Sequence, residues 1–146
     1  MSLLDTNIII AILRGKQEIV NKYQFISSKD QLIYIATYSI AEIYIGFQDQ
    51  AYKHKNLEKL NIQKTLFSKM VNYLDAQKRV ISLKIDDAKI LGRLLYKLKT
   101  SGKPIPLIDA ILSAIGISRD LIIITSDKNH FKVLKTIQDK LKVDFW

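Results

Sequence analysis

The sequence contains no cysteine and only two histidines, His54 and His130. The lack of cysteine excludes disulfide bonds and cysteine-ligated zinc, and two histidines are too few for a histidine-rich metal site. Any metal ion would therefore have to be held by carboxylates. Oxygen ligands of this kind favour Mg²⁺ or Mn²⁺.

Long apolar runs are also missing, since none approaches the roughly 20 residues that a membrane-spanning helix requires. The first residues have neither the charged start nor the apolar stretch of a signal peptide. We therefore expect a cytoplasmic protein with no membrane partner.

Acidic residues are scarce, with 14 against 23 lysines and arginines, which leaves a net charge of +9. Such an excess favours a polyanionic partner, either nucleic acid or an acidic protein. It is equally compatible with a soluble basic protein that has no such partner, so charge alone does not assign a function.

No internal repeat or linker rich in proline and glycine divides the 146 residues, of which 48% are hydrophobic. One domain covering residues 1–146 is therefore expected. Short β-forming runs alternate with stretches of helical periodicity. This alternation predicts a three-layer α/β/α fold around a central, mainly parallel sheet of four to five strands. The expected strands are 3–4, 32–36, 79–83, 121–125 and 143–145, and the expected helices include 6–13, 17–26, one from about 39, 86–100, one ending at 117, and 129–134.

Four acidic residues stand at or near the ends of the expected strands or the starts of the helices. Asp5 follows the first strand, and Glu42 falls in the first turn of a helix expected to begin near Ser39. Asp109 opens the helix after a proline-marked turn, and Asp127 follows the strand 121–125. Because ligands bind at the carboxyl ends of parallel strands, all four could project into one cleft.

Each of these acids also has a local structural explanation. Asp5 and Asp127 could N-cap the helices after them, Ser39 and Glu42 fit the capping-box pattern S-x-x-E, and Asp109 could complement a helix dipole. The recurrence of four acids at one sheet edge favours a functional cluster instead. Clustered carboxylates repel each other unless a cation lies between them. Two hard divalent ions roughly 4 Å apart can hold the attacking and leaving oxygens of a phosphodiester.

Four ordered stretches, "LLDTNIII", "YSIAEIYIGF", "GKPIPLIDAILSAIGI" and "IIITSDKNHFKVL", and the closing "LKVDFW" resemble the PIN-domain ribonucleases, particularly the VapC-type toxins of toxin–antitoxin pairs. The resemblance implies an endoribonuclease dependent on Mg²⁺ or Mn²⁺, with an RNA substrate, a cognate antitoxin and a homodimer built from N-terminal helices. The metal ligands and catalytic acids that it implies are Asp5, Glu42, Asp109 and Asp127, with Thr6, Asn7, Thr125 and Ser126 in supporting positions and Asn129 as a neighbouring polar candidate.

Other residues have open assignments. Lys89, Arg93 and Lys97 form one basic helical stripe, which could contact RNA phosphates or simply be a solvated helix face. For His130 we expect packing or hydrogen bonding rather than general-base catalysis, and for His54 a solvated position.

Competing functions belong to other classes of protein. A receiver domain would place an aspartate directly after its third strand, where this sequence has Ser82 and Lys84, and a haloacid-dehalogenase phosphatase would need D-x-D in place of Asp5-Thr6-Asn7. A non-catalytic RNA-binding or scaffold domain of the same fold would be marked by the loss of acids, and none is lost. A DNA-directed nuclease stays open, because carboxylates do not read the 2′-hydroxyl group.

Overall fold

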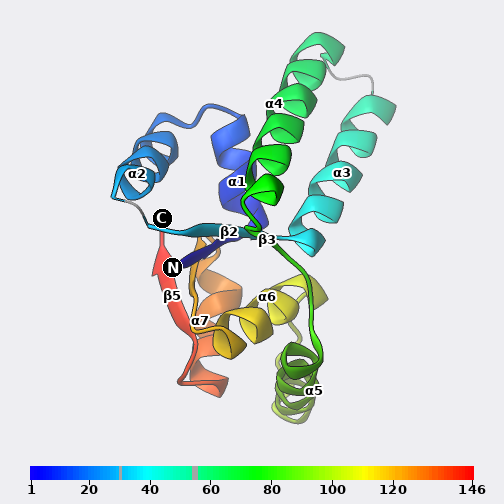
Figure 1. Ribbon diagram of the computed structural model, residues 1–146. Coiled ribbons are helices and arrows are strands. Elements are labelled where there is room, and N and C mark those ends of the chain that lie inside the picture. Colours follow the sequence, from blue (N-terminus) through cyan, green and yellow to red (C-terminus); the bar gives the residue numbers. More distant parts are fainter. Residues whose placement is uncertain (30, 54–55) are drawn as a thin grey trace.

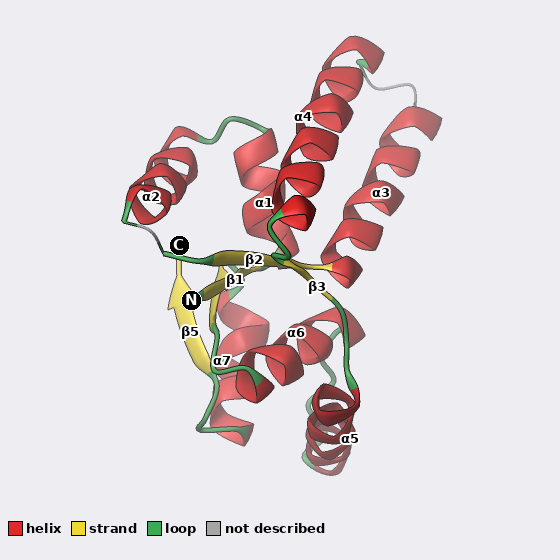
Figure 2. Cartoon of the chain, viewed as in Figure 1, coloured by secondary structure: helices red, strands yellow, loops and turns green. Residues whose placement is uncertain are grey.

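The computed structural model describes residues 1–29, 31–53 and 56–146. Its five strands form one parallel sheet in the order β3-β2-β1-β4-β5 (Figures 1 and 2). The strand at the β3 edge pairs over fewer residues than expected. The bounds are β1 (Ser2–Leu4), β2 (Ile33–Ala36), β3 (Val80–Ile81), β4 (Ile122–Thr125) and β5 (Lys142–Phe145).

Helices cover both faces of the sheet, which confirms the expected three-layer class (Figure 1). One layer contains α1 (Thr6–Leu13), α2 (Gln17–Ser28), α3 (Thr37–Tyr52) and α4 (Leu57–Ala76). The other contains α5 (Ile85–Thr100), α6 (Leu107–Ser118) and α7 (Lys128–Ile137). Within the described ranges, no helix is both long and apolar enough to cross a membrane.

Two apolar cores hold these layers to the sheet. Successive side chains of a strand point to opposite faces, so Leu3 packs in the core beneath α6 and α7 while Leu4 packs in the core beneath α1 and α4. Both leucines are fully buried, as in a sheet covered on both faces. The layer of α6 lies close to β4 at Gly116, where a Cβ atom would stand 3.1 Å from the side chain of Ile123.

The start of α3 differs from the prediction. The helix begins at Thr37, directly after β2, with Ala36 as its N-cap residue. Glu42 therefore lies in the second turn, and the alternative explanation of Ser39 and Glu42 as a capping box does not hold. Ser39 is inside the helix and fully buried, so its packing against the rest of the fold outweighs its local preference for a cap.

The start of α5 also differs from the prediction. The helix was expected over residues 86–100, but α5 begins at Ile85, and Asp86 is exposed in its first turn. The acid at the helix start is Asp87, whose carboxylate accepts a hydrogen bond from the amide of Lys84 (2.8 Å) and pairs with Arg119 (2.5 Å). A contact with a residue far along the chain thus fixes this helix start. The position expected for His54 lies outside the described residues.

Candidate active site

The carboxyl ends of β1 and β4 bring the predicted acids together. The two strands are paired with Leu4 opposite Ile124, so Asp5 emerges beside the end of β4, and Asp127 follows β4 as the N-cap residue of α7. The first turn of α6 supplies Asp109. The charges of these acids reach one another, because the charge of Asp5 raises the pKa of Asp109 and the charge of Asp127 raises the pKa of both.

Asp5 is nearly inaccessible, with 4% of its surface exposed, and its carboxylate accepts three hydrogen bonds. Oδ1 accepts from the amide of Thr6 (2.7 Å), so Asp5 is the N-cap of α1. Oδ2 accepts from the hydroxyl of Thr125 (2.6 Å) and from the amide group of Asn7 (2.8 Å). Burial raises the pKa of Asp5, and the charges of Glu42 and Asp127 raise it too, against the lowering effect of the Thr125 and Thr6 hydrogen bonds.

The supporting residues join the two strand ends. Besides its bond to Asp5, the side chain of Asn7 donates to the Thr125 hydroxyl (3.1 Å) and accepts from the amide of Ser126 (3.1 Å). The Thr125 hydroxyl also accepts from the amide of Asp127 (2.9 Å). The hydroxyl of Thr6 is buried with no hydrogen-bond partner among the described residues. The network holds the carboxylate of Asp5 in one orientation.

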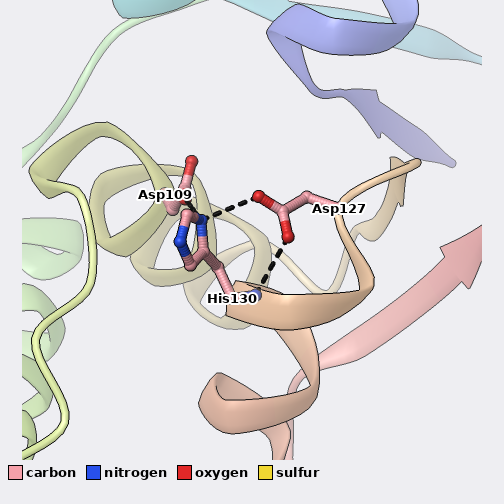
Figure 3. A group of neighbouring side chains, drawn as sticks. All are labelled: Asp109, Asp127 and His130. Carbon is pink, nitrogen blue, oxygen red and sulfur yellow. Dashed lines mark hydrogen bonds and ion pairs between the residues drawn. The ribbon is translucent and has the colours of Figure 1, made fainter.

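A second group in the cluster combines two carboxylates with an imidazole (Figure 3). Nδ1 of His130 lies 2.8 Å from Oδ2 of Asp109 and 2.7 Å from Oδ2 of Asp127. The other oxygen of Asp127 caps α7 by accepting from the amides of Asn129 (2.9 Å) and His130 (3.0 Å). One ligand atom from each of Asp109, Asp127 and His130 lies within 4.8 Å of the other two, a spacing that suits a single metal ion.

The electrostatics of the cluster suit a cation. Burial and the charge of Asp5 raise the pKa of Asp109 to about 6, although His130 acts to lower it. Carboxylates whose pKa values are raised by burial and by each other gain from a positive charge placed between them. The donor set of carboxylate oxygens and one imidazole nitrogen therefore fits a divalent ion.

Glu42 is exposed on α3 and outside that group of three. It is near enough for its charge to raise the pKa of Asp5. The structure thus brings Glu42 within electrostatic reach of the buried acids but leaves its side chain in solvent.

Sequence reasoning gave His130 no place in the cluster. The signal that could have found it is its spacing from Asp127, because residues three apart share one face of a helix. Its contact with Asp109 depends on the packing of α7 against α6, which the sequence does not reveal.

The basic stripe is not brought to the acids. The amine of Lys89 pairs with Asp86 (3.1 Å). Arg93 and Lys97 line a cavity together with Ile117 and Gln138 at the carboxyl ends of α6 and α7. Asp109 and Asp127 stand at the opposite, amino ends of the same two helices.

Comparison with known proteins identifies one family. The family model described as "PIN domain" matches residues 2–136, a range that includes all four acids. No curated protein matches the chain.

Solved structures share the fold at low sequence identity. VapBC2 from Rickettsia felis, bound to a DNA fragment from its promoter, has a TM-score of 0.75 at 20% identity and covers 99% of this chain and 98% of its own. DNA-bound VapBC from Salmonella typhimurium has a TM-score of 0.77 at 19% identity, with 100% and 99% covered. FitAcB from Neisseria gonorrhoeae has a TM-score of 0.76 at 23% identity, with 100% and 97% covered.

Proposed function

Since the chain belongs to the PIN-domain family, we propose that it is a metal-dependent endoribonuclease and the toxin of a VapBC-type toxin–antitoxin pair. The observation that carries this proposal is the convergence of Asp5, Asp109 and Asp127, with Glu42 nearby, at the carboxyl ends of β1 and β4. The structural neighbours named as VapBC complexes support the assignment to that type. A single domain spanning residues 1–146 would carry the activity.

The cleft residues have distinct parts in the proposed chemistry. When bound, Mg²⁺ or Mn²⁺ supplies an activated water and neutralises charge on the scissile phosphate. Asp109 and Asp127 would hold the ion through the oxygens that face the cleft, with Asp5 and Glu42 completing its acidic surroundings. The hydrogen bonds from Thr125 and Asn7 keep Asp5 in place, so little reorganisation is needed during the reaction.

RNA would be attracted by the basic surface rather than by the acids. A net charge of +9 favours binding to phosphates without regard to base sequence. Lys89, Arg93 and Lys97 are candidates for such contacts, at a distance from the acids.

The proposed protein partners are an antitoxin and a second copy of the chain, both met in the cytoplasm. Exposed apolar side chains support such contacts, because a stable interface buries aromatic and aliphatic groups. Most of them lie on the α3–α4 hairpin rather than on α1 and α2. The hairpin residues are Tyr44, Ile45, Tyr52, Leu57, Ile62, Leu66 and Tyr73.

The test of the function compares Asp5→Asn with Asp86→Asn, which makes the same chemical change at an exposed aspartate of α5. Asp5→Asn should lower the rate of RNA cleavage by orders of magnitude, because the buried negative charge beside the ion is lost. Its affinity for RNA should stay similar or rise slightly, because a negative charge that faces phosphate is gone. The measurements are a gel-based cleavage time course and a matched binding titration.

Asp86→Asn should cleave as the wild type does. Melting curves of both variants control for folding, since Asp5 also caps α1. Equal cleavage by Asp5→Asn and wild type would contradict the proposal. RNA binding by the wild type without cleavage, in Mg²⁺ or Mn²⁺, would favour a non-catalytic binding domain, and cleavage of a matched DNA strand alone would favour a DNA-directed nuclease.

A further inference from the structure

One nitrogen atom stands among the oxygens of the acidic cluster. Nδ1 of His130 is 2.8 Å from Asp109 and 2.7 Å from Asp127. It is buried, yet neither contact has the geometry of a hydrogen bond, and the nitrogen has no such partner among the described residues. Figure 3 shows the ring directed toward the two carboxylates, between α6 and α7.

The position of this nitrogen is set by packing. His130 lies in the first turn of α7, whose amino end is capped by Asp127. The next residue, Phe131, is fully buried in the core under that helix. A cap on one side and a buried phenyl ring on the other fix the helix turn, so the imidazole faces Asp109 and Asp127 without a separate ordering step.

The oxygens beside His130 are the ones left available in the cluster. Oδ1 of Asp127 accepts two backbone hydrogen bonds, which leaves Oδ2 toward the ring. Both oxygens of Asp5, by contrast, already accept protein hydrogen bonds. The atoms with the fewest competing partners are therefore those of the group Asp109, Asp127 and His130, which lie within 4.8 Å of one another.

We propose that His130 is a ligand of the divalent ion through Nδ1, so that the site combines carboxylate oxygens with one imidazole nitrogen. This inference rests on the proposed function, because the ion is the one that would serve cleavage. Coordination requires the neutral ring with its hydrogen on Nε2, so that the Nδ1 lone pair is available. The alternative is a histidine that only pairs with the two carboxylates and leaves when the ion binds.

A nitrogen ligand has a consequence for metal preference. Imidazole suits first-row transition ions, whereas Mg²⁺ prefers oxygen ligands throughout. The site should therefore bind Mn²⁺ more tightly than Mg²⁺. Replacing His130 by glutamine should weaken Mn²⁺ binding by about tenfold or more, the scale on which changes around metal ligands act, and should weaken Mg²⁺ binding less.

The direct test uses the full chain loaded with Mn²⁺ and pulsed electron paramagnetic resonance, which detects the nuclear spin of a coordinated imidazole ¹⁴N. The wild type should show this coupling and His130→Gln should lack it. His54→Gln is the matched control, because His54 is the only other histidine of the sequence. That variant should keep the coupling, and calorimetric titrations of Mn²⁺ and Mg²⁺ give the affinity ratio of each protein.

The outcomes separate the ligand from the function. Bound Mn²⁺ and RNA cleavage without imidazole coupling in the wild type would overturn the role of His130 and leave the nuclease in place. Coupling that disappears in His54→Gln would overturn it as well, even if His130→Gln failed to fold. Imidazole coupling without RNA cleavage would support His130 as a metal ligand and count against the nuclease function. The absence of bound metal would contradict both proposals.

Discussion

Asp5 serves the fold and the proposed chemistry with one carboxylate. Its Oδ1 caps α1, and its Oδ2 accepts hydrogen bonds from Thr125 at the end of β4 and from Asn7 in the first turn of α1. A local structural role and a place in the cleft are therefore not alternatives at this residue. Asp127 has the same double role, since one oxygen caps α7 and the other faces His130.

At Asp109, the cost of an ionised carboxylate that is both desolvated and beside another acid can be measured without a lost cap. Burial and Asp5 raise its pKa from 3.8 to about 6. The ionised side chain therefore destabilises the metal-free fold: the penalty is absent below pH 3.8, grows as the pH rises and is complete above about 6. Asp109→Asn should raise the free energy of unfolding in EDTA by about 3 kcal/mol at about pH 8, less any loss of the His130 contact.

Urea denaturation at about pH 8 and about pH 4 measures this difference, with Asp86→Asn as the exposed control. The gain in free energy of unfolding that Asp109→Asn brings should be smaller at the lower pH, where the Asp109 carboxyl of the folded wild type is mostly protonated. A variant that is less stable than wild type to the same extent at both pH values would show that burial and repulsion of the charge do not destabilise the fold at this side chain.

At the scale of elements, α5 and α6 are held together by an ion pair between buried Asp87 and half-buried Arg119. Asp87 is 1% exposed and accepts hydrogen bonds from Arg119 and from the amide of Lys84, while Arg119 also donates to the carbonyl of Ser82 (2.6 Å). Arg119 follows the carboxyl end of α6, the helix whose first turn carries Asp109. This pair therefore helps to set the helix that presents an acid to the cleft.

Loss of the Asp87 charge should destabilise the fold. Burial raises the pKa of Asp87, but the hydrogen bonds from Arg119 and Lys84 outweigh it and bring the pKa below the ordinary 3.8. Its contribution is thus present above pH 3.8 and is lost as the pH falls through the lower, folded-state value. Asp87→Asn should cost about 2 kcal/mol at neutral pH, because Arg119 loses its carboxylate partner.

Denaturation curves of Asp87→Asn measure that cost in the free energy of unfolding. Asp86→Asn is the control, because it makes the same change at the neighbouring, exposed position. The difference in free energy of unfolding between wild type and Asp87→Asn should become smaller below pH 3.8. Indistinguishable curves for the two variants at neutral pH would mean that the ion pair contributes nothing to stability.

The same elements show what the sequence can and cannot reveal. The β-forming runs predicted the strands, and the rule for carboxyl ends of parallel strands put all four acids at one edge. The side chain of Glu42 is exposed and outside the group of Asp109, Asp127 and His130. The starts of α3 and α5 were wrong, because Ser39 is buried by the fold and Asp87 is paired with a residue 32 positions away. The contact of His130 with Asp109 was missed for the same reason, since it joins two helices.

At the scale of the whole molecule, a net charge of +9 accompanies the cluster of acids at the ends of β1 and β4. The positive charge should bind RNA through its phosphates, with counterions released on binding. The logarithm of affinity should therefore fall linearly with the logarithm of salt concentration, with the same slope for wild type and Asp5→Asn. In the double variant Arg93→Gln/Lys97→Gln, the magnitude of this slope should decrease by about 2 if both residues contact phosphates.

Binding titrations over a series of salt concentrations give these slopes. Arg93 and Lys97 lie at the opposite ends of α6 and α7 from the acids. A changed slope would therefore show that bound RNA reaches from the acids across the layer of α5, α6 and α7. An unchanged slope would make the stripe a solvated face with no part in RNA binding.

The central claim is that the acids at the ends of β1 and β4 cut RNA through a divalent ion, and removing the ion tests it most directly. The measurement is a cleavage time course on one defined RNA, with wild type and Asp109→Asn first stripped by EDTA and dialysed. Stripped wild type should not cut, and Mg²⁺ or Mn²⁺ should restore its cleavage but not that of Asp109→Asn. Cleavage at the full rate by stripped wild type would contradict the claim.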